Sequence, residues 1–153
     1  MTTQERIDEL KELIIKATAL VEKPLVYGVD FEIIHQPMHH TPVRLKAGYM
    51  AVYSFFWGET VLKVGQAGSN NKARFQSQHY QTFRYRANAS TLARSIVGDS
   101  SMEYLDLNDY TVGDWIKNNC ERFDVLLDAK LGKITLNFIE GLLQYKYQPK
   151  FEG

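Results

Sequence analysis

Two short runs of β-branched and aromatic residues, separated by only three residues, constrain the fold of this chain most. The first run covers residues 49–56 and the second covers residues 60–65. The intervening Trp57-Gly58-Glu59 is short enough for a tight turn, so the two runs predict an antiparallel β-hairpin. The fold is therefore expected to be built around a small antiparallel sheet.

Helical patterns surround the predicted hairpin. Residues 2–19 carry apolar residues at helical intervals, and Thr2 and Glu5 have the spacing of a capping box. A second helix is expected to begin at Asn70 or Asn71, either of which could cap it, and to end about residue 78. Further helices are expected over 90–96, over 112–119, and over 133–147, before Pro149. Residues 122–127 have the composition of a third strand. The predicted fold class is α/β of the α+β type, a three-stranded antiparallel sheet flanked by helices.

The region before the hairpin is less regular. Residues 24–46 hold three of the four prolines, which indicates a connector with a short strand at 30–34. Its three histidines, at positions 35, 39 and 40, raise the alternative of a zinc site, but no cysteine or carboxylate stands at a ligand-like offset around the His39-His40 pair. We expect one domain, with residues 1–46 as an accessory part and residues 47–153 as the main body.

Composition limits the class of protein without naming it. A chain of 153 residues can bury an ordinary core, and its 18 basic and 18 acidic residues cancel. No apolar run of about 18 residues is present and the N-terminus is too polar for a signal peptide, so a cytoplasmic location away from membranes is expected. The single Cys120 is expected to be a packed side chain.

The charge is balanced overall but not locally. Residues 63–94 contain six basic residues and no acidic one, with Phe75, Tyr80, Phe83 and Tyr85 interleaved among them. This mixture is typical of surfaces that neutralise phosphates and contact bases or sugars, although a solvated face is the alternative. The six are Lys63, Lys72, Arg74, Arg84, Arg86 and Arg94.

Three side chains around the hairpin could act on a phosphodiester. Tyr53 ends the first strand and would serve as a general base if the cation of Lys63, on the second strand, lowered the pKa of its phenol. Arg74, on the helix that follows, could hold a phosphate oxygen with its planar fork. Each residue taken alone also has an ordinary structural explanation.

The last helix adds a carboxylate. Ile134, Phe138, Leu142 and Tyr145 are expected to form the centre of its apolar face, and Glu140 falls at the edge of that face. One half-buried carboxylate and a substrate phosphate are enough to hold Mg²⁺, which keeps several of its waters. The alternative for Glu140 is a surface ion pair.

The order of these residues resembles the GIY-YIG endonuclease family. Ala51-Val52-Tyr53 stands at the place of the first signature triplet and Lys63-Val64-Gly65 at the place of the second. The stretch 61–74 and the spacing from Glu140 to Pro149 are particularly similar to the nuclease half of the bacterial nucleotide-excision repair incision subunit. The resemblance covers about residues 48–153.

The resemblance implies a nuclease domain over residues 47–153 that cuts DNA by a one-metal hydrolysis. Tyr53 would activate the attacking water, Arg74 would stabilise the pentavalent phosphate, and Glu140 would hold Mg²⁺ or Mn²⁺. A homodimer would be required to cut both strands of a palindromic site. The expected DNA contacts are Lys72, Arg84, Arg86 and Arg94.

Three positions depart from the family pattern. Lys63 replaces the tyrosine of the second triplet, as in some restriction enzymes of the family. Gln78 stands where a histidine or tyrosine is usual, and a small shift of the helix would bring the next residue, His79, into the site. Glu152 replaces an asparagine that usually follows the proline.

Three functions therefore stay open. The first is an active DNA endonuclease, of a restriction or mobile-element type in preference to a repair subunit. The second is a nucleic-acid-binding module that keeps the fold without the chemistry. The third is a protein-interaction or small-ligand domain in which the basic and aromatic segment is only surface.

Overall fold

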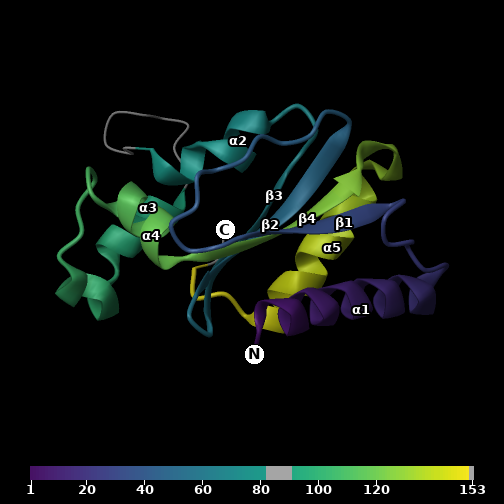
Figure 1. The fold of residues 1–153 in the computed structure, drawn as a ribbon, viewed down its shortest axis with the longest axis horizontal. Helices are drawn as coiled ribbons and strands as arrows, with labels where there is room; N and C mark the ends of the chain where they lie inside the picture. Colours follow the sequence, from purple (N-terminus) through teal and green to yellow (C-terminus); the bar gives the residue numbers. More distant parts are fainter. Residues whose placement is uncertain (82–90, 152–153) are drawn as a thin grey trace.

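The computed structural model describes residues 1–81 and 91–151, and within them four strands form one antiparallel sheet. The strand order is β1-β4-β2-β3, so β1 and β3 are the edges (Figure 1). The α+β class predicted from the sequence is confirmed, with one strand more than expected. The strands are β1 (Phe31–Gln36), β2 (Tyr49–Trp57), β3 (Thr60–Ala67) and β4 (Glu121–Asp128).

Helices cover both faces of the sheet. In Figure 1, α1 and α5 lie on one face, and α2, α3 and α4 lie on the other. The α-helices are α1 (Thr3–Val21), α2 (Lys72–Gln76), α3 (Thr91–Gly98), α4 (Val112–Asn119) and α5 (Gly132–Tyr147). Short 3₁₀ segments are η1 (Gln78–Tyr80), η2 (Ser100–Leu105) and η3 (Ala129–Leu131). No helix within the described residues has the length and apolar character needed to cross a membrane.

The central strand β2 supplies two hydrophobic cores because its side chains alternate between the two faces. Met50, Val52 and Phe56 are buried with residues of α1 and α5. Ala51, Tyr53 and Phe55 are buried with residues of α2, α3 and α4. Burial on both faces explains why the strand is almost continuously apolar in sequence.

The hairpin prediction is confirmed. β2 and β3 pair antiparallel, with Tyr53 opposite Gly65, and the chain reverses between Trp57 and Thr60. Gly58 in the turn has φ 59°, in the left-handed region that favours glycine. The register shifts by one residue between Phe55 and Phe56, so the turn and this irregularity together place Gly65 opposite Tyr53.

The fourth strand comes from the region expected to be an accessory connector. β1 pairs with β4 from Phe31 opposite Leu127 to Gln36 opposite Arg122. Leu10 and Ile14 of α1 are buried in the core under the sheet. The short strand expected at 30–34 is confirmed as β1, but the sheet has four strands where three were expected, because the partner of β1 lies about ninety residues later in the chain, in β4.

The apolar face of α5 also differs from the expectation. Its buried residues are Leu136, Ile139 and Leu143, whereas Ile134 is 86% exposed and Tyr145 is 81% exposed. Two apolar stripes run along this helix. Only the stripe formed by Leu136, Ile139 and Leu143 packs into the core beside the sheet. Glu140 follows Ile139 directly and therefore lies at the border of the buried stripe.

After α5 the chain returns to the free edge of β3. The backbone N–H of Lys150 donates to the carbonyl of Val61 (2.8 Å), and that of Phe151 donates to the carbonyl of Leu62 (2.9 Å). The tail therefore pairs with Val61 and Leu62 at the beginning of β3. These backbone hydrogen bonds do not extend to Lys63 and the residues after it.

Candidate active site

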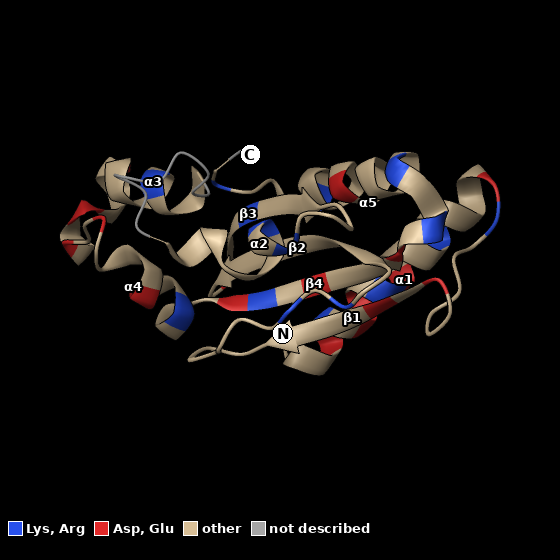
Figure 2. Ribbon diagram, turned by 90° about the horizontal axis from the view of Figure 1, so that it is seen from above, with Lys and Arg blue, Asp and Glu red and all other residues tan. Residues whose placement is uncertain are grey.

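Four of the five predicted site residues meet in one hollow of about 160 Å³ at the β3 edge of the sheet. The hollow is built from β2, β3, α2 and α5, which are far apart in the sequence. In Figure 2, the basic part of β3 lies beside helix α2, which is also basic. The lining residues are Tyr53, Lys63, Gly65, Gln66, Arg74 and Glu140.

Sheet geometry explains how these groups converge. Tyr53 on β2 and Lys63 on β3 belong to the face covered by α2, since Lys63 pairs with Phe55, two residues beyond Tyr53. Glu140 comes from α5 on the opposite face. Because β3 is the last strand, a side chain from α5 can reach the hollow past that edge.

Tyr53 lies against Gly65, its cross-strand neighbour. A Cβ atom added at Gly65 would be 2.6 Å from Tyr53 Oη and 2.7 Å from Cζ, so the ring occupies the space that any other residue would fill. Tyr53 is 1% exposed, and its burial raises the pKa of the phenol to about 12, although the charges of Arg74 and Arg122 act in the opposite direction. The expectation that nearby cations favour the phenolate is therefore wrong for the free protein, because burial outweighs them.

Lys63 is a nearly buried cation. It is 4% exposed, and its Nζ donates a hydrogen bond to Thr91 Oγ1 at the start of α3 (2.7 Å). Burial lowers the pKa of Lys63 to about 8, with a further lowering by Arg74 and an opposing effect of Glu140. Most of the ammonium is still protonated at pH 7, so it places a positive charge beside the hollow.

Arg74 lies on the exposed side of α2. The side chain of Asn71 accepts a hydrogen bond from the Arg74 backbone N–H (3.3 Å), which confirms one of the two predicted caps of this helix. The helix ends at Gln76, two residues earlier than predicted, and η1 follows. Phe75 is fully buried and fixes the helix to the core, which leaves the Arg74 guanidinium in the hollow.

His79 does not line the hollow. It is fully buried behind Tyr53, with ring centroids 4.5 Å apart, and it also contacts Phe55 at 5.0 Å. Burial lowers the pKa of His79 well below its ordinary value, and Arg122, Lys63 and Arg74 lower it further, whereas a hydrogen bond with the Arg74 backbone opposes them. His79 is therefore a neutral support for Tyr53 and for the turn after Arg74, and its expected place among the reacting groups is corrected.

Glu140 is half-buried and held by two amides. Gln66 Nε2 donates a hydrogen bond to Glu140 Oε2, and Gln144 Nε2 donates one to Oε1 at 3.5 Å. Gln66 also accepts a hydrogen bond from Lys133 Nζ (3.0 Å) and donates one to Asn137 Oδ1 (3.0 Å). Sequence analysis did not single out Gln66, although it follows the Lys63-Val64-Gly65 triplet directly.

The donor set fits a hard divalent cation bound through few protein ligands. Glu140 is the carboxylate that lines the hollow, and carboxylate oxygens are ligands that Mg²⁺ and Mn²⁺ prefer. Within the described residues there is no group of three or more His, Cys, Asp or Glu side chains that could hold a metal ion. A cation here would therefore have Glu140 as its protein carboxylate and would complete its coordination with water and substrate oxygens.

The three histidines of the connector region have separate partners. His35 Nε2 is 2.6 Å from Glu121 Oε2, and His40 Nε2 is 2.7 Å from the hydroxyl of Tyr80. His39 Nδ1 is 3.3 Å from Asn118 Oδ1. These contacts give the histidines structural roles in place of a shared zinc site.

Of the expected DNA contacts, Lys72 and Arg94 are exposed, on α2 and α3 respectively. Neither lines the hollow. Arg84, Arg86 and the departure at Glu152 lie outside the described residues. The described part of the expected DNA contacts therefore consists of Lys72 and Arg94, on the side of the sheet covered by α2 and α3.

A buried ion pair behind the hollow was missed from the sequence. Arg122 and Asp124 are both fully buried on β4, with Arg122 Nη2 3.1 Å from Asp124 Oδ1. Arg122 Nη1 donates to the carbonyl of Phe75 (2.9 Å) and to the hydroxyl of Tyr80 (3.2 Å). Gln36 Nε2 donates to the other Asp124 oxygen (2.6 Å). Two ionisable residues inside an apolar strand run are the signal that indicates such a network.

Comparison of the chain with known protein families, with curated proteins and with solved structures finds no match. The interpretation of the hollow therefore rests on its own residues and on their geometry.

Proposed function

We propose that this protein is a metal-dependent DNA endonuclease of the GIY-YIG type, which hydrolyses a phosphodiester with one Mg²⁺ or Mn²⁺ ion. The observation that carries the proposal is the meeting of a phenol, an ammonium, a guanidinium and a carboxylate in one hollow at a sheet edge. The proposal includes a cytoplasmic location, where the enzyme would meet DNA, and a restriction or mobile-element role. Cutting both strands of a palindromic site would require a homodimer.

The cations of the hollow suit a phosphate under attack. Arg74 presents a planar fork that can donate two hydrogen bonds to phosphate oxygens. The Lys63 ammonium, held by Thr91, adds a second positive charge in a place where burial weakens screening by water. Together they would stabilise the negative charge that grows on the phosphate oxygens as the water attacks.

Tyr53 would orient the attacking water. Its ring packs against Gly65 on one side and against the ring of His79, so the position of the phenol is fixed before substrate arrives. With a pKa of about 12, the phenol keeps its own proton in the free protein at pH 7. Its role as a proton acceptor would begin only when additional positive charge in the hollow lowers that pKa.

Glu140 would hold the cation, and Gln66 and Gln144 would keep the carboxylate aimed at the hollow. The divalent ion, when bound, supplies positive charge that stabilises the transition state and lowers the pKa of neighbouring acids. The leaving oxygen would depart from the phosphorus on the side opposite to the attacking water.

One alternative has specific support. Both oxygens of Glu140 are already hydrogen-bonded to amides, and Tyr53 is protonated, which is also the state expected of a DNA-binding module without catalysis. Such a module would use Lys72, Arg74 and Arg94 for phosphate contacts and would form no product.

The two functions are separated by incubating supercoiled plasmid with the protein in Mg²⁺, in Mn²⁺ and in EDTA, while DNA binding is measured in parallel. The endonuclease predicts nicked or linear plasmid that forms only with a divalent ion. Binding that weakens steeply with salt, with no product in either ion, would select the binding module. Absence of both binding and cleavage at low salt would reject both functions.

A further inference from the structure

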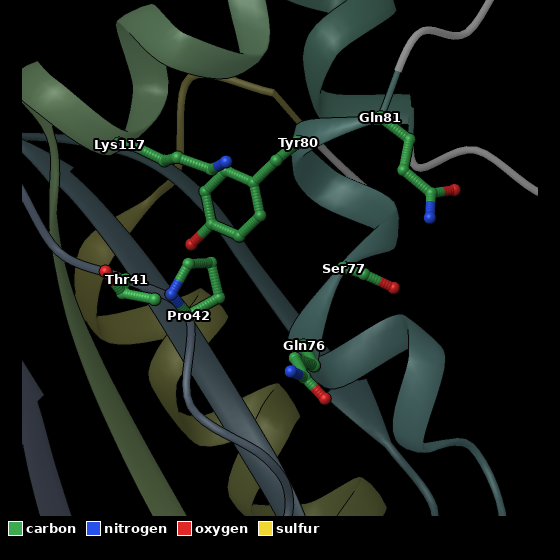
Figure 3. A pocket seen from close by; sticks show the side chains of 7 residues that line it. All are labelled: Thr41, Pro42, Gln76, Ser77, Tyr80, Gln81 and Lys117. Carbon is green, nitrogen blue, oxygen red and sulfur yellow. The ribbon is translucent and has the colours of Figure 1, made fainter.

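Helix α2 separates the candidate active site from a second hollow of about 300 Å³. At about 100° per residue, Arg74 and Gln76 project to opposite sides of the buried Phe75. Arg74 lines the active-site hollow and Gln76 lines the second one (Figure 3). The polar residues around the second hollow are Thr41, Gln76, Ser77, Tyr80, Gln81 and Lys117.

The chemistry of the second hollow suits an anion that carries hydrogen-bonding oxygens. Lys117 supplies an ammonium that makes no ion pair with any described carboxylate, and none of the described residues that line the hollow is acidic. Gln76 and Gln81 add amide donors. The charges of Lys117 and Arg122 reach His40, beside Tyr80: burial lowers the pKa of this histidine most, and the two cations lower it further.

The hollow is also held rigid. The hydroxyl of Tyr80 is fixed by His40 Nε2 (2.7 Å) and Arg122 Nη1 (3.2 Å). Gly113 on α4 lies so close to η1 that an added Cβ would be 2.1 Å from the carbonyl oxygen of Tyr80. Lys117 follows Gly113 by one helical turn, so this contact aims it at η1, where its Nζ lies 5.4 Å from the centre of the Tyr80 ring (Figure 3).

We propose that this second hollow is a substrate subsite, which binds a backbone phosphate of the same DNA strand that is cut in the active-site hollow. The inference rests on the proposed nuclease function. An α-helix with its side chains is about 10–12 Å across, and DNA advances about 3.4 Å along the duplex axis per nucleotide of one strand, so a duplex whose axis crosses α2 advances about three nucleotides over that width. A strand that passes over α2 from Arg74 to Lys117 would therefore place the bound phosphate about three nucleotides from the cut bond.

Binding of a labelled 12-base-pair duplex in EDTA tests whether Lys117 contacts DNA. We expect Lys117→Gln to weaken binding about three- to tenfold and to reduce the slope of log affinity against log salt by about one. Gln76→Ala should weaken binding about twofold. The matched control is Lys16→Gln on α1, on the other face of the sheet, which should leave affinity and slope unchanged.

The position of the phosphate is tested on a duplex whose cut site has been mapped. A neutral methylphosphonate placed about three linkages from the cut should weaken binding by the wild type as much as Lys117→Gln does. The same methylphosphonate should not weaken binding by the Lys117→Gln variant any further. If the losses of affinity from the methylphosphonate and from Lys117→Gln add at every linkage tested, the subsite is overturned.

The remaining outcomes distinguish this inference from the function on which it rests. Absence of DNA binding and cleavage by the wild type would reject the nuclease itself. Normal binding and cutting by Lys117→Gln would overturn only the subsite. Displacement of the duplex by micromolar deoxynucleoside monophosphate, lost in Lys117→Gln, would also overturn it, because the hollow would then bind a free nucleotide.

Discussion

At the scale of single residues, Gly65 gives the active-site hollow its shape. Tyr53 packs over it so closely that no side chain fits at position 65, and the ring is confined on another side by His79. The glycine is required here for close approach, since the left-handed glycines of the chain lie elsewhere. This contact places a nearly buried phenol at the wall of a polar hollow.

Gly65→Ala should therefore displace Tyr53 and damage the site. The overpacking should lower the free energy of unfolding by about 1–3 kcal/mol, and cleavage should fall at least about tenfold because a small misplacement of an orienting group is costly. Urea unfolding and plasmid nicking measure the two effects. Gly68→Ala is the control, since a Cβ there meets no atom within 4 Å. Nicking by Gly65→Ala at the wild-type rate would contradict the assigned place of Tyr53.

The buried ammonium of Lys63 is expected to lower the free energy of unfolding, although it supplies a positive charge to the hollow. Its pKa is about 8 in the folded protein and about 10.5 in the unfolded chain, so the unfolded state binds more protons between these values. The stability of the wild type should rise with pH through that window. Lys63→Met should raise the free energy of unfolding by about 1–2 kcal/mol at pH 7, with no gain above pH 10.5.

Urea unfolding of wild type and Lys63→Met at pH 7 and at pH 10.5 measures this difference directly. The comparison removes the contribution of other groups that titrate in the same range. A gain in stability that is independent of pH would contradict the lowered pKa of Lys63.

At the scale of secondary-structure elements, the position of α2 depends on one buried network. The helix spans only Lys72–Gln76, too short to be stable by itself. Phe75 anchors it twice, by its buried ring and by its carbonyl, which accepts a hydrogen bond from Arg122. The ion pair of Arg122 with Asp124 is expensive to bury, so we interpret it as a device that fixes α2, and with it Arg74.

Substitutions in this network should affect the free energy of unfolding and the cleavage rate to different extents. Arg122→Met should destabilise the fold by about 3–5 kcal/mol, because it leaves Asp124 buried without its cation. Arg122→Met combined with Asp124→Leu should recover most of that loss. The double variant should still cleave about tenfold more slowly, since the Phe75 carbonyl has lost its donor. Cleavage at the wild-type rate by a stable double variant would show that the network does not position Arg74.

The sequence predicts local elements better than their packing. The hairpin, the capping box of α1 and the limits of α4 follow from short-range patterns and are confirmed. The prediction of the buried face of α5 is wrong because the helix has two apolar stripes. Only contact with the sheet selects the stripe that contains Ile139. The same limit applies to Arg122, whose role depends on Phe75 and Tyr80, more than forty positions earlier.

The groups that line the hollow could be identified from the sequence because most of them lie close together along the chain. Tyr53 and Lys63 belong to one hairpin, and Arg74 to the helix that follows it, so local connectivity already brings them together. Glu140 was identified from its place at the edge of the apolar face of the last helix and from its spacing to Pro149 in the resemblance. The protonation of Tyr53 could not be predicted, because it depends on burial by residues from several elements.

At the scale of the whole molecule, the first 46 residues belong to the fold. β1 pairs with β4 along its whole length, and α1 contributes Leu10 and Ile14 to the core. Gln36 also joins the network through Asp124. The region expected to be accessory therefore closes one edge of the sheet and covers part of one face.

Deletion of residues 1–46 should consequently abolish folding. The remaining chain would expose the edge of β4 and the core residues beneath α1 and would tend to aggregate. Thermal unfolding followed by circular dichroism should show no cooperative transition. Deletion of residues 1–2, which removes only the α1 cap, is the control and should cost about 1 kcal/mol. Cooperative folding of residues 47–153 alone would contradict this account.

The most direct test of the central claim is the rate of plasmid nicking in Mg²⁺ by wild type, Tyr53→Phe and Glu140→Gln. Exposed residues provide matched controls: Tyr145→Phe on α5 and Glu12→Gln on α1. Since Tyr53 and Glu140 line one hollow, we expect each of the two site variants to lose at least about 100-fold in rate while the controls cut normally. Equal cutting by all five proteins would contradict the claim that these groups form one hydrolytic site.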